Sequence, residues 1–330
     1  MPSARQNGHD GESNRGVAGR RDDKAGAKDG EQQHNEQHGE DDGEGNIVEK
    51  TKENDATGDD DQTEYLLLDS ITDRAYQARL NKAVGLGCHG LIELAPCGTR
   101  VTKCARTYGR DAYTRCVKAR YLIRELDVYR YLNPHPRILA FYGFTADRDT
   151  AFITLEYMKN GDLRRYLEDH PHQTMRQRLL WCAQAAEGPH YLHSQKVIHS
   201  DMRTENMLVA DDLTLRLIDF GGSAIDGDRA LVAEATRYFL PRADWTTTPD
   251  TDRFALGSCF YHMMTGHDPH HDVEHDLVDA RFAAKVYPDD VHALPVGDVI
   301  INCWECKYTT TREVYMDLYN LRDKVASLAG

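Results

Sequence analysis

The amino-acid sequence predicts an α+β fold in which a small β-rich region precedes a larger, mainly helical region. Two observations support this prediction. Between Ala83 and Lys103, short strand patterns flank a glycine-rich turn, and a helical pattern over Ala112–Leu132 follows them. Beyond residue 159 the longest pattern is again helical and covers Met175–Ser194.

The first 63 residues differ in composition from the rest of the 330-residue chain. They contain 17 Asp and Glu against 8 Lys and Arg, and they have almost no large apolar residue before Ile47. Such a stretch cannot bury enough apolar surface to offset the entropy lost on ordering. We therefore expect residues 1–63 to form a disordered acidic tail.

The composition also limits which binding partners and which cellular location we expect. A net charge of −14 without a dominant basic patch argues against nucleic-acid binding. No apolar run has the ~18 residues of a membrane span, and the polar N-terminus lacks a secretory signal. Eight scattered cysteines then indicate free thiols, and the lone Cys303-x-x-Cys306 favours packing over zinc. The expected location is cytoplasmic or nuclear, with no membrane partner.

A G-x-G-x-x-G motif is formed by Gly85, Gly87 and Gly90. Glycines let the backbone approach phosphate groups closely and donate N–H groups to them. Alone, the motif also fits a dinucleotide site or a hairpin that binds nothing. A dinucleotide site needs a helix directly after the glycines, whereas here a turn and a second strand containing Lys103 follow. The sequence therefore disfavours the dinucleotide site.

Glu125 falls on the apolar side of the helix expected over Ala112–Leu132, between Leu122 and Tyr129. Acidic side chains on a buried face are nearly always paired. Lys103, on the preceding strand, is the natural partner. The alternative is that Glu125 reaches solvent at the edge of the apolar side.

Two short apolar runs, Met207–Val209 and Leu213–Leu217, are predicted to pair as a hairpin. Asn206 enters the hairpin where Asp219 leaves it, so their side chains are expected within one strand spacing, ~5 Å. Amide and carboxylate oxygens at this separation suit Mg²⁺. Asp201 lies in the loop that feeds the hairpin and would face the same space as a base. Taken singly, each of these is also a common turn residue.

Residues 199–206 read H-S-D-M-R-T-E-N, and residues 219–221 read D-F-G. Together with the glycine motif, Lys103 and Glu125, they resemble the eukaryotic protein kinases, in which the corresponding motifs read H-R-D-L-K-P-E-N and D-F-G. The resemblance covers residues 82–326.

The resemblance implies a bilobal protein-kinase-like fold of the α+β class. A small β-rich N-lobe with one main helix, together with the hinge, would occupy residues 64–158, and a larger helical C-lobe residues 159–330. It further implies ATP and Mg²⁺ as cofactors and a protein substrate. Because Glu205 and Asn206 match the Ser/Thr branch, Ser and Thr hydroxyls are the expected acceptors, and a monomer is expected.

The site residues that the resemblance implies fall into three groups. The catalytic group contains the base, the pair that anchors the α and β phosphates, and a cation near the transferred phosphoryl group: Asp201, Lys103, Glu125 and Arg203. The nucleotide-binding group contains the glycine loop, the strand lysine and the hinge: Gly85, Gly87, Gly90, Lys103, Glu156 and Met158. The metal ligands are Asn206 and Asp219.

The sequence departs from the family pattern in ways that affect regulation. Ser200 replaces the arginine of H-R-D, so no guanidinium beside Asp201 awaits a phosphorylated loop, and we expect activity without loop phosphorylation. The resemblance implies an activation and substrate-docking segment over residues 223–242, which we call the docking segment. Arg242 replaces the glutamate of A-P-E, so the docking segment must be held differently or be mobile. Gly222 is an extra glycine after D-F-G.

Two further features lie in the predicted helical region. Residues 248–266 contain D-R-F-A-L-G from Asp252 onward, which resembles the family motif D-x-W-x-x-G at the start of the central helix of the larger lobe, and Asp252 is positioned to cap that helix. Residues 268–291 are rich in Asp and His, which favours a solvated loop over a metal site.

The rival functional interpretation is a pseudokinase, which has the same fold but acts as a nucleotide-binding or scaffolding module. Ser200 and Arg242 support that alternative. A small-molecule kinase of related fold fits less well, because such enzymes lack this glycine loop and the Asp252 helix start.

Overall fold

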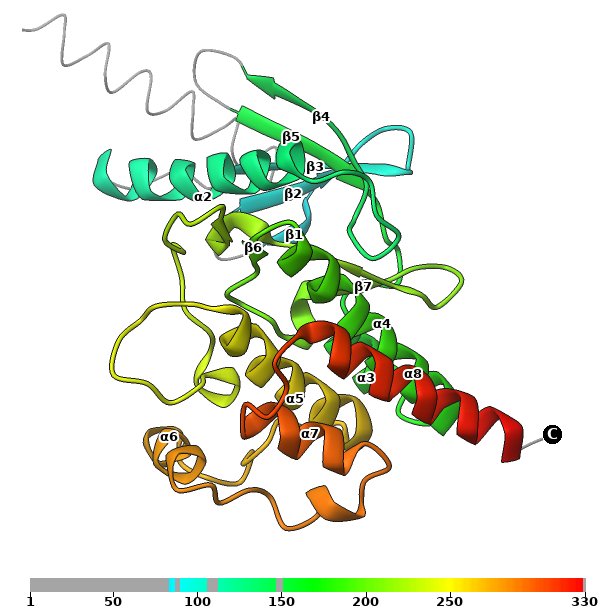
Figure 1. Cartoon of the computed structure of the whole chain (residues 1–330). Helices are drawn as coiled ribbons and strands as arrows, with labels where there is room; N and C mark the ends of the chain where they lie inside the picture. Colours follow the sequence, from blue (N-terminus) through cyan, green and yellow to red (C-terminus); the bar gives the residue numbers. More distant parts are fainter. Residues whose placement is uncertain (1–82, 87–89, 106–111, 147–150, 329–330) are drawn as a thin grey trace, which may run out of the picture. The chain divides into compact units, whose positions relative to one another are not determined.

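The computed structural model describes residues 83–86, 90–105, 112–146 and 151–328 (Figure 1). The expected acidic tail over residues 1–63 and the central glycine of the motif, Gly87, lie outside the described residues.

The N-terminal lobe combines one antiparallel sheet with one long helix. Its elements are β1 (Ala83–Leu86), β2 (Gly90–Leu94), β3 (Arg100–Ala105), α2 (Ala112–Tyr131), β4 (Phe141–Ala146) and β5 (Ala151–Glu156). The strand order is β1-β2-β3-β5-β4, and each neighbouring pair is antiparallel. In Figure 1, α2 runs alongside this sheet.

Strand β3 lies at the centre of the sheet and carries Lys103. Lys103 pairs in register with Ile92 of β2 and with Ile153 of β5, which is completely buried. The β2–β3 turn closes at Gly98, whose φ of 69° lies in the left-handed region that favours glycine. Strands β2 and β5, which flank β3, therefore fix the position of Lys103 along the sheet.

The C-terminal lobe is built from six helices and two short ribbons among the described residues. The helices are α3 (Leu163–Asp169), α4 (Met175–Ser194), α5 (Pro249–Thr265), α6 (His275–Ala283), α7 (Gly297–Trp304) and α8 (Thr311–Leu328). The ribbons pair β6 (Val197–Ile198) with β9 (Ala224–Ile225) and β7 (Met207–Val209) with β8 (Leu215–Leu217). The expected β-rich N-lobe and helical C-lobe are therefore confirmed.

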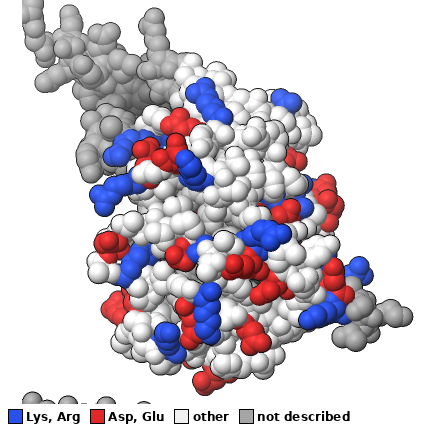
Figure 2. Space-filling view, viewed as in Figure 1, with Lys and Arg blue, Asp and Glu red and all other residues white. Residues whose placement is uncertain are grey.

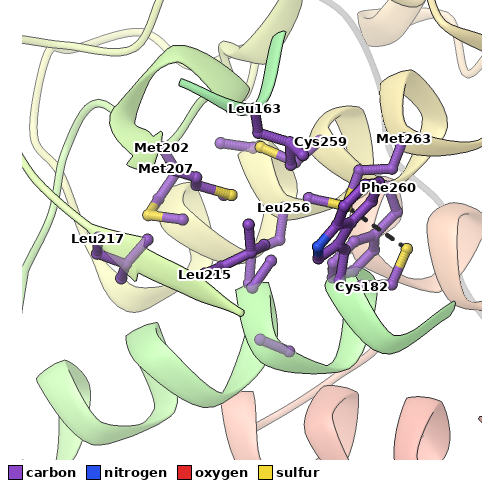
Figure 3. Close-up of a cluster of buried hydrophobic side chains, with 14 of the residues drawn as sticks. Leu163, Cys182, Met202, Met207, Leu215, Leu217, Leu256, Cys259, Phe260 and Met263 are labelled. Atoms are coloured by element: carbon purple, nitrogen blue, oxygen red, sulfur yellow. Dashed lines mark hydrogen bonds between the residues drawn. The ribbon is translucent and has the colours of Figure 1, made fainter. Parts of the chain in front are cut away.

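The core of the C-terminal lobe reaches directly under the loop that contains Asp201. Met202 from this loop and Met207 from β7 are buried near Leu215 and Leu256 (Figure 3). Burial of such side chains is worth about 1.5–3 kcal/mol each. The loop is therefore fastened to the core by its own apolar residues.

The structure corrects three sequence-based expectations. Asp252 does not cap α5, because the N-cap residue is Thr248 and Asp252 lies in the first turn with its side chain buried. The second strand of the hairpin begins at Leu215, because Leu213 adopts φ 62° and its carbonyl accepts a hydrogen bond from the Trp181 indole. The loop expected over residues 268–291 contains α6.

Among the described helices, none combines the length and apolar character that crossing a bilayer would require. On the face drawn in Figure 2, acidic and basic side chains are interspersed rather than gathered in one patch of a single sign.

Candidate active site

Lys103 joins two carboxylates at the boundary between the lobes. Its Nζ lies 2.6 Å from Oε2 of Glu125 on α2 and 2.8 Å from Oδ1 of Asp219, which follows β8. Glu125 is 1% exposed, so it does not escape to solvent at the edge of the helix. The expected pairing of Lys103 with Glu125 is therefore present, and Asp219 completes a three-residue cluster.

Burial and ion pairing shift the pKa values of this cluster in opposite directions. Burial acts to lower the pKa of Lys103, but Asp219 and Glu125 outweigh it, so the pKa is raised and the ammonium stays charged. Burial raises the pKa of Glu125 to about 7 in spite of Lys103. Ionised Glu125 is thus held at an energetic cost, whereas Lys103 is charged throughout the neutral range.

The backbone at Asp219 directs its carboxylate toward Lys103. Asp219 adopts φ 64° and ψ 58°, a left-handed conformation that is uncommon outside glycine. The next residue, Phe220, is completely buried, and its ring meets Tyr129 of α2 edge-on at 5.2 Å and His199 at 5.3 Å. The phenylalanine therefore anchors the turn that presents Asp219.

Asp201 and Asn206 face each other within their loop. Asn206 Nδ2 donates to the Asp201 carbonyl at 2.8 Å and to Asp201 Oδ2 at 3.0 Å. Burial raises the pKa of Asp201, while His199, Arg203 and Asn206 oppose that shift. The amide of Asn206 uses its nitrogen toward Asp201, which directs its oxygen away from Asp201.

The main-chain path around Asp201 is fixed by His199. Nε2 of its imidazole lies 2.9 Å from the Ile218 carbonyl and must donate to it, so Nδ1 is free to accept the Asp201 N–H at 3.3 Å. One ring therefore links the loop of Asp201 to the segment that leads to Asp219.

Asp252 supports the loop of the candidate site, whereas the sequence suggested that it caps a helix. Its side chain is completely buried, and its carboxylate accepts the N–H groups of His199 at 2.8 Å and of Ser200 at 2.9 Å. These bonds hold Ser200 at φ 69°. Two signals at this position were present in the sequence: an acidic residue within an apolar helix, as at Glu125, and the resemblance of Asp252 to the family motif at the start of that helix.

Asp252 also accepts a hydrogen bond from His193 on α4. His193 Nε2 lies 2.8 Å from Asp252, and His193 Nδ1 lies 2.7 Å from the hydroxyl of Thr311, the first residue of α8. Because a carboxylate only accepts, Nε2 carries the proton and Nδ1 accepts from Thr311. The start of α8 is thereby connected to the loop of Asp201.

Arg203 lies near Asp201 but binds another residue. Its guanidinium pairs with Glu205, and Glu205 also forms an ion pair with Arg164, whose Nε lies 2.9 Å from its carboxylate. Arg164 in turn contacts Asp268, which accepts from the Tyr238 hydroxyl at 2.7 Å. The charge of Arg203 still opposes the rise that burial causes in the pKa of Asp201.

The glycine motif is partly visible. Gly85 lies in β1 and Gly90 begins β2. A Cβ at Gly90 would lie 2.9 Å from the Cys104 carbonyl oxygen and 3.1 Å from Cγ of Lys103. Gly90 is therefore required for close approach to the lysine, a reason additional to phosphate contact.

The expected hinge residues lie where β5 leads into the second lobe. Glu156 ends β5, and its N–H donates to the Ala140 carbonyl at 3.0 Å. Met158 is buried, and its carbonyl accepts the Gly161 N–H at 3.2 Å.

Ser200 and Arg242, which depart from the family pattern, find partners close to their own positions. The Ser200 hydroxyl donates to the Ile198 carbonyl at 3.3 Å and lies 3.2 Å from the hydroxyl of Thr247. Arg242 forms an ion pair of 2.8 Å with Glu234, whose side chain is completely buried, and its guanidinium lies over the ring of Phe239. The docking segment is therefore held by an internal ion pair.

Comparison with known proteins gives a consistent result. The family model described as "Protein kinase domain" matches residues 81–296. The chain is 26% identical over 175 residues to Aurora kinase of Eremothecium gossypii, 29% over 174 to serine/threonine-protein kinase Aurora-1 of Arabidopsis thaliana, and 33% over 178 to tyrosine-protein kinase SPK-1 of Girardia tigrina. These matches cover 50–51% of the chain but 47%, 59% and 32% of the relatives, so the chain spans less than two thirds of each.

Proposed function

The chain belongs to the protein kinase family, and from this premise we propose that it transfers the γ-phosphate of ATP to Ser and Thr hydroxyls of protein substrates. The observation that carries the proposal is the convergence of five polar groups. Lys103 contacts Glu125 and Asp219, and Asp201 contacts Asn206, across one site.

In the proposed reaction, Asp201 orients the acceptor hydroxyl and accepts its proton. The Lys103 ammonium, held by Glu125, neutralises the α and β phosphates, and the loop from Gly85 to Gly90 covers them. Arg203 supplies positive charge near the transferred group. Phosphoryl transfer depends mainly on positioning and charge stabilisation, which these groups provide.

The donor set also fits a magnesium ion. Asp219 offers carboxylate oxygen, and the amide oxygen of Asn206 is directed away from Asp201. Hard oxygen ligands of this kind suit Mg²⁺, which usually binds through one or two protein groups together with phosphate oxygens and waters. When bound, Mg²⁺ neutralises phosphate charge.

The preference for Ser and Thr rests on the Glu205-Asn206 pair and on the Aurora relatives, whereas SPK-1 is named a tyrosine kinase. We further propose an intracellular monomer with an N-lobe and hinge over residues 64–158 and a C-lobe over residues 159–330, preceded by a separate acidic tail over residues 1–63.

The decisive experiment measures phosphate transfer from labelled ATP and Mg²⁺ to a generic protein, followed by phosphoamino-acid analysis. Asp201→Asn should lower the rate about 10²–10⁴-fold, the usual contribution of a positioned base. Asp211→Asn is the matched control, because Asp211 lies in the exposed hairpin turn. Transfer at the wild-type rate by Asp201→Asn would show that the base is misassigned.

The same preparation separates the enzyme from the pseudokinase. Nucleotide at 100 times its Kd should stabilise a true nucleotide site by about 2.7 kcal/mol. Stabilisation of wild type without any transfer would establish the pseudokinase instead.

A further inference from the structure

We infer that Arg124 is a positioning residue that ties α2 to the segment after Asp219, so that Glu125 reaches Lys103 without any modification of that segment. The inference rests on the proposed function and concerns its regulation. Arg124 immediately precedes Glu125 in the chain and projects ~100° away from it around the helix. One residue therefore faces the lysine while its neighbour faces the segment.

Arg124 binds this segment mainly through main-chain oxygens. Its Nη1 donates to the carbonyl of Ser223 at 2.9 Å and, at a longer 3.4 Å, to that of Arg229. Its Nη2 lies 3.6 Å from Asp228, and its side chain is only 15% exposed. One turn earlier on α2, the Tyr121 hydroxyl donates to the carbonyl of Leu231 at 3.3 Å.

The segment is folded so that these carbonyls face α2. A turn at Asp226 and Gly227, with φ of 45° and 94°, reverses the chain, and the Leu231 N–H donates to the Gly222 carbonyl at 2.8 Å. Residues 222–231 thus form a closed loop whose carbonyl groups match the fixed array of guanidinium donors. We call residues 222–232 the tether loop.

The tether loop depends on the two glycines that follow Phe220. A Cβ at Gly222 would lie 2.1 Å from Cγ2 of Val232, and a Cβ at Gly221 would lie 3.0 Å from the Tyr121 carbonyl oxygen. Gly221 therefore permits close approach to α2, and Gly222 permits closure of the loop. This gives the extra glycine of the sequence a structural role.

The contacts between Arg124 and the tether loop do not require phosphorylation of the loop. Ser223 is the only Ser, Thr or Tyr in the tether loop, and it is completely buried with its hydroxyl donating to the His199 carbonyl at 3.0 Å. Ser200 offers no guanidinium to a phosphate. Main-chain carbonyls, by contrast, are acceptors in every copy of the protein.

The first test compares Arg124→Met with Arg120→Met in the full chain. Arg120 is exposed on the same helix, so the pair is matched in charge change. Arg124→Met should speed amide hydrogen exchange in α2 roughly tenfold or more, because a local opening becomes easier. It should also lower kcat/KM for ATP about 10–100-fold through misplacement of Glu125. Arg120→Met should change neither, and Arg124→Lys, with fewer donors, should recover part.

The second test opens the tether loop and closes it again by steric changes alone. Gly222→Ala should reproduce both effects of Arg124→Met, because its methyl group would collide with Val232. Adding Val232→Ala removes Cγ1 and Cγ2 and leaves Cβ, at 3.1 Å, as the nearest Val232 atom, so the double variant should recover most of the lost exchange protection and activity.

The exchange measurement needs neither nucleotide nor phosphate transfer, so it tests whether Arg124 holds α2 even if the chain proves inactive. Unchanged α2 exchange in Arg124→Met, or no recovery in the Gly222→Ala/Val232→Ala variant, would overturn the inference. Phosphatase treatment provides the last arm. Activity should survive it, and activity lost with the phosphate would show that a modification, not the tether, holds α2.

Discussion

The loop of Asp201 and helix α2 form opposite walls of the candidate site, and they are anchored by different means. The loop, residues 199–206, is held by buried Met202 and by two main-chain N–H bonds to Asp252, which is completely buried. Helix α2 reaches the site through Glu125 and is held by Arg124 and Tyr121, whose hydrogen bonds are partly solvent-accessible.

This difference indicates which wall is able to move. Buried networks with every partner present open only with large parts of the fold, whereas partly exposed contacts open locally. The C-lobe wall therefore behaves as a fixed base. The N-lobe wall is the adjustable part, and its position decides whether Lys103 and Glu125 meet.

The largest expected effect is that of Asp252→Ala, which removes the buried anchor of the loop that contains Asp201. This change leaves the N–H groups of His199 and Ser200 without their acceptor in a buried site and removes the partner of His193. Loss of one side of such a buried charged network typically costs about 4 kcal/mol. Urea unfolding should show this loss. A loss below 1 kcal/mol would mean that the loop does not depend on its buried anchor.

Arg242→Glu should give a smaller loss, about 3 kcal/mol, because it places a second carboxylate beside buried Glu234. The exchanged pair, Glu234→Arg with Arg242→Glu, should recover part of the stability. Lys196→Gln is the control, since its pair with Asp226 is mostly exposed and such pairs contribute 0–1 kcal/mol. Equal losses for Arg242→Glu and Lys196→Gln would contradict the assignment of a buried clamp.

The smallest effect concerns the pH dependence of the N-lobe wall. The pKa of Glu125 is about 7 in the folded chain, above its ordinary value, so the folded state binds this proton more tightly than the unfolded state. The free energy of unfolding that Glu125 contributes therefore falls as pH rises from 5.5 to 7.5, by about 2 kcal/mol at most.

Glu125→Gln removes this titration while keeping the side-chain shape. Unfolding measured at pH 5.5 and 7.5 should show a steeper decline for wild type than for the variant. Parallel declines would mean that Glu125 is already ionised throughout this range and that the N-lobe wall carries no such cost.

Sequence patterns predicted the parts of the site that depend on local periodicity. Glu125 was identified because it interrupts the apolar side of a helix, and it does meet Lys103. The hairpin between Asn206 and Asp219 was predicted from its two apolar runs, and β7 pairs with β8 as expected apart from the turn. In each case the spacing along one element, or across one turn, contained the information.

Contacts between distant segments could not be predicted in this way. Asp252 lies far from His199 in the chain, so its first-turn position suggested a cap, and only the approach of α5 beneath the loop reveals its bonds. Glu234 and Arg242 meet because of the path of an irregular segment. The contacts of Arg124 could not be predicted either, because its acceptors are main-chain carbonyls, whose positions no residue type in the sequence specifies.

The contact between His193 and Thr311 has a consequence for where the structural unit around Asp201 ends. The family match stops at residue 296, before α8 begins, yet Thr311 at the start of α8 fixes the imidazole that supports Asp252. The final helix is thus part of the scaffold beneath Asp201. Trimming the protein at the edge of the family match would remove a buried hydroxyl on which the geometry of the loop containing Asp201 depends.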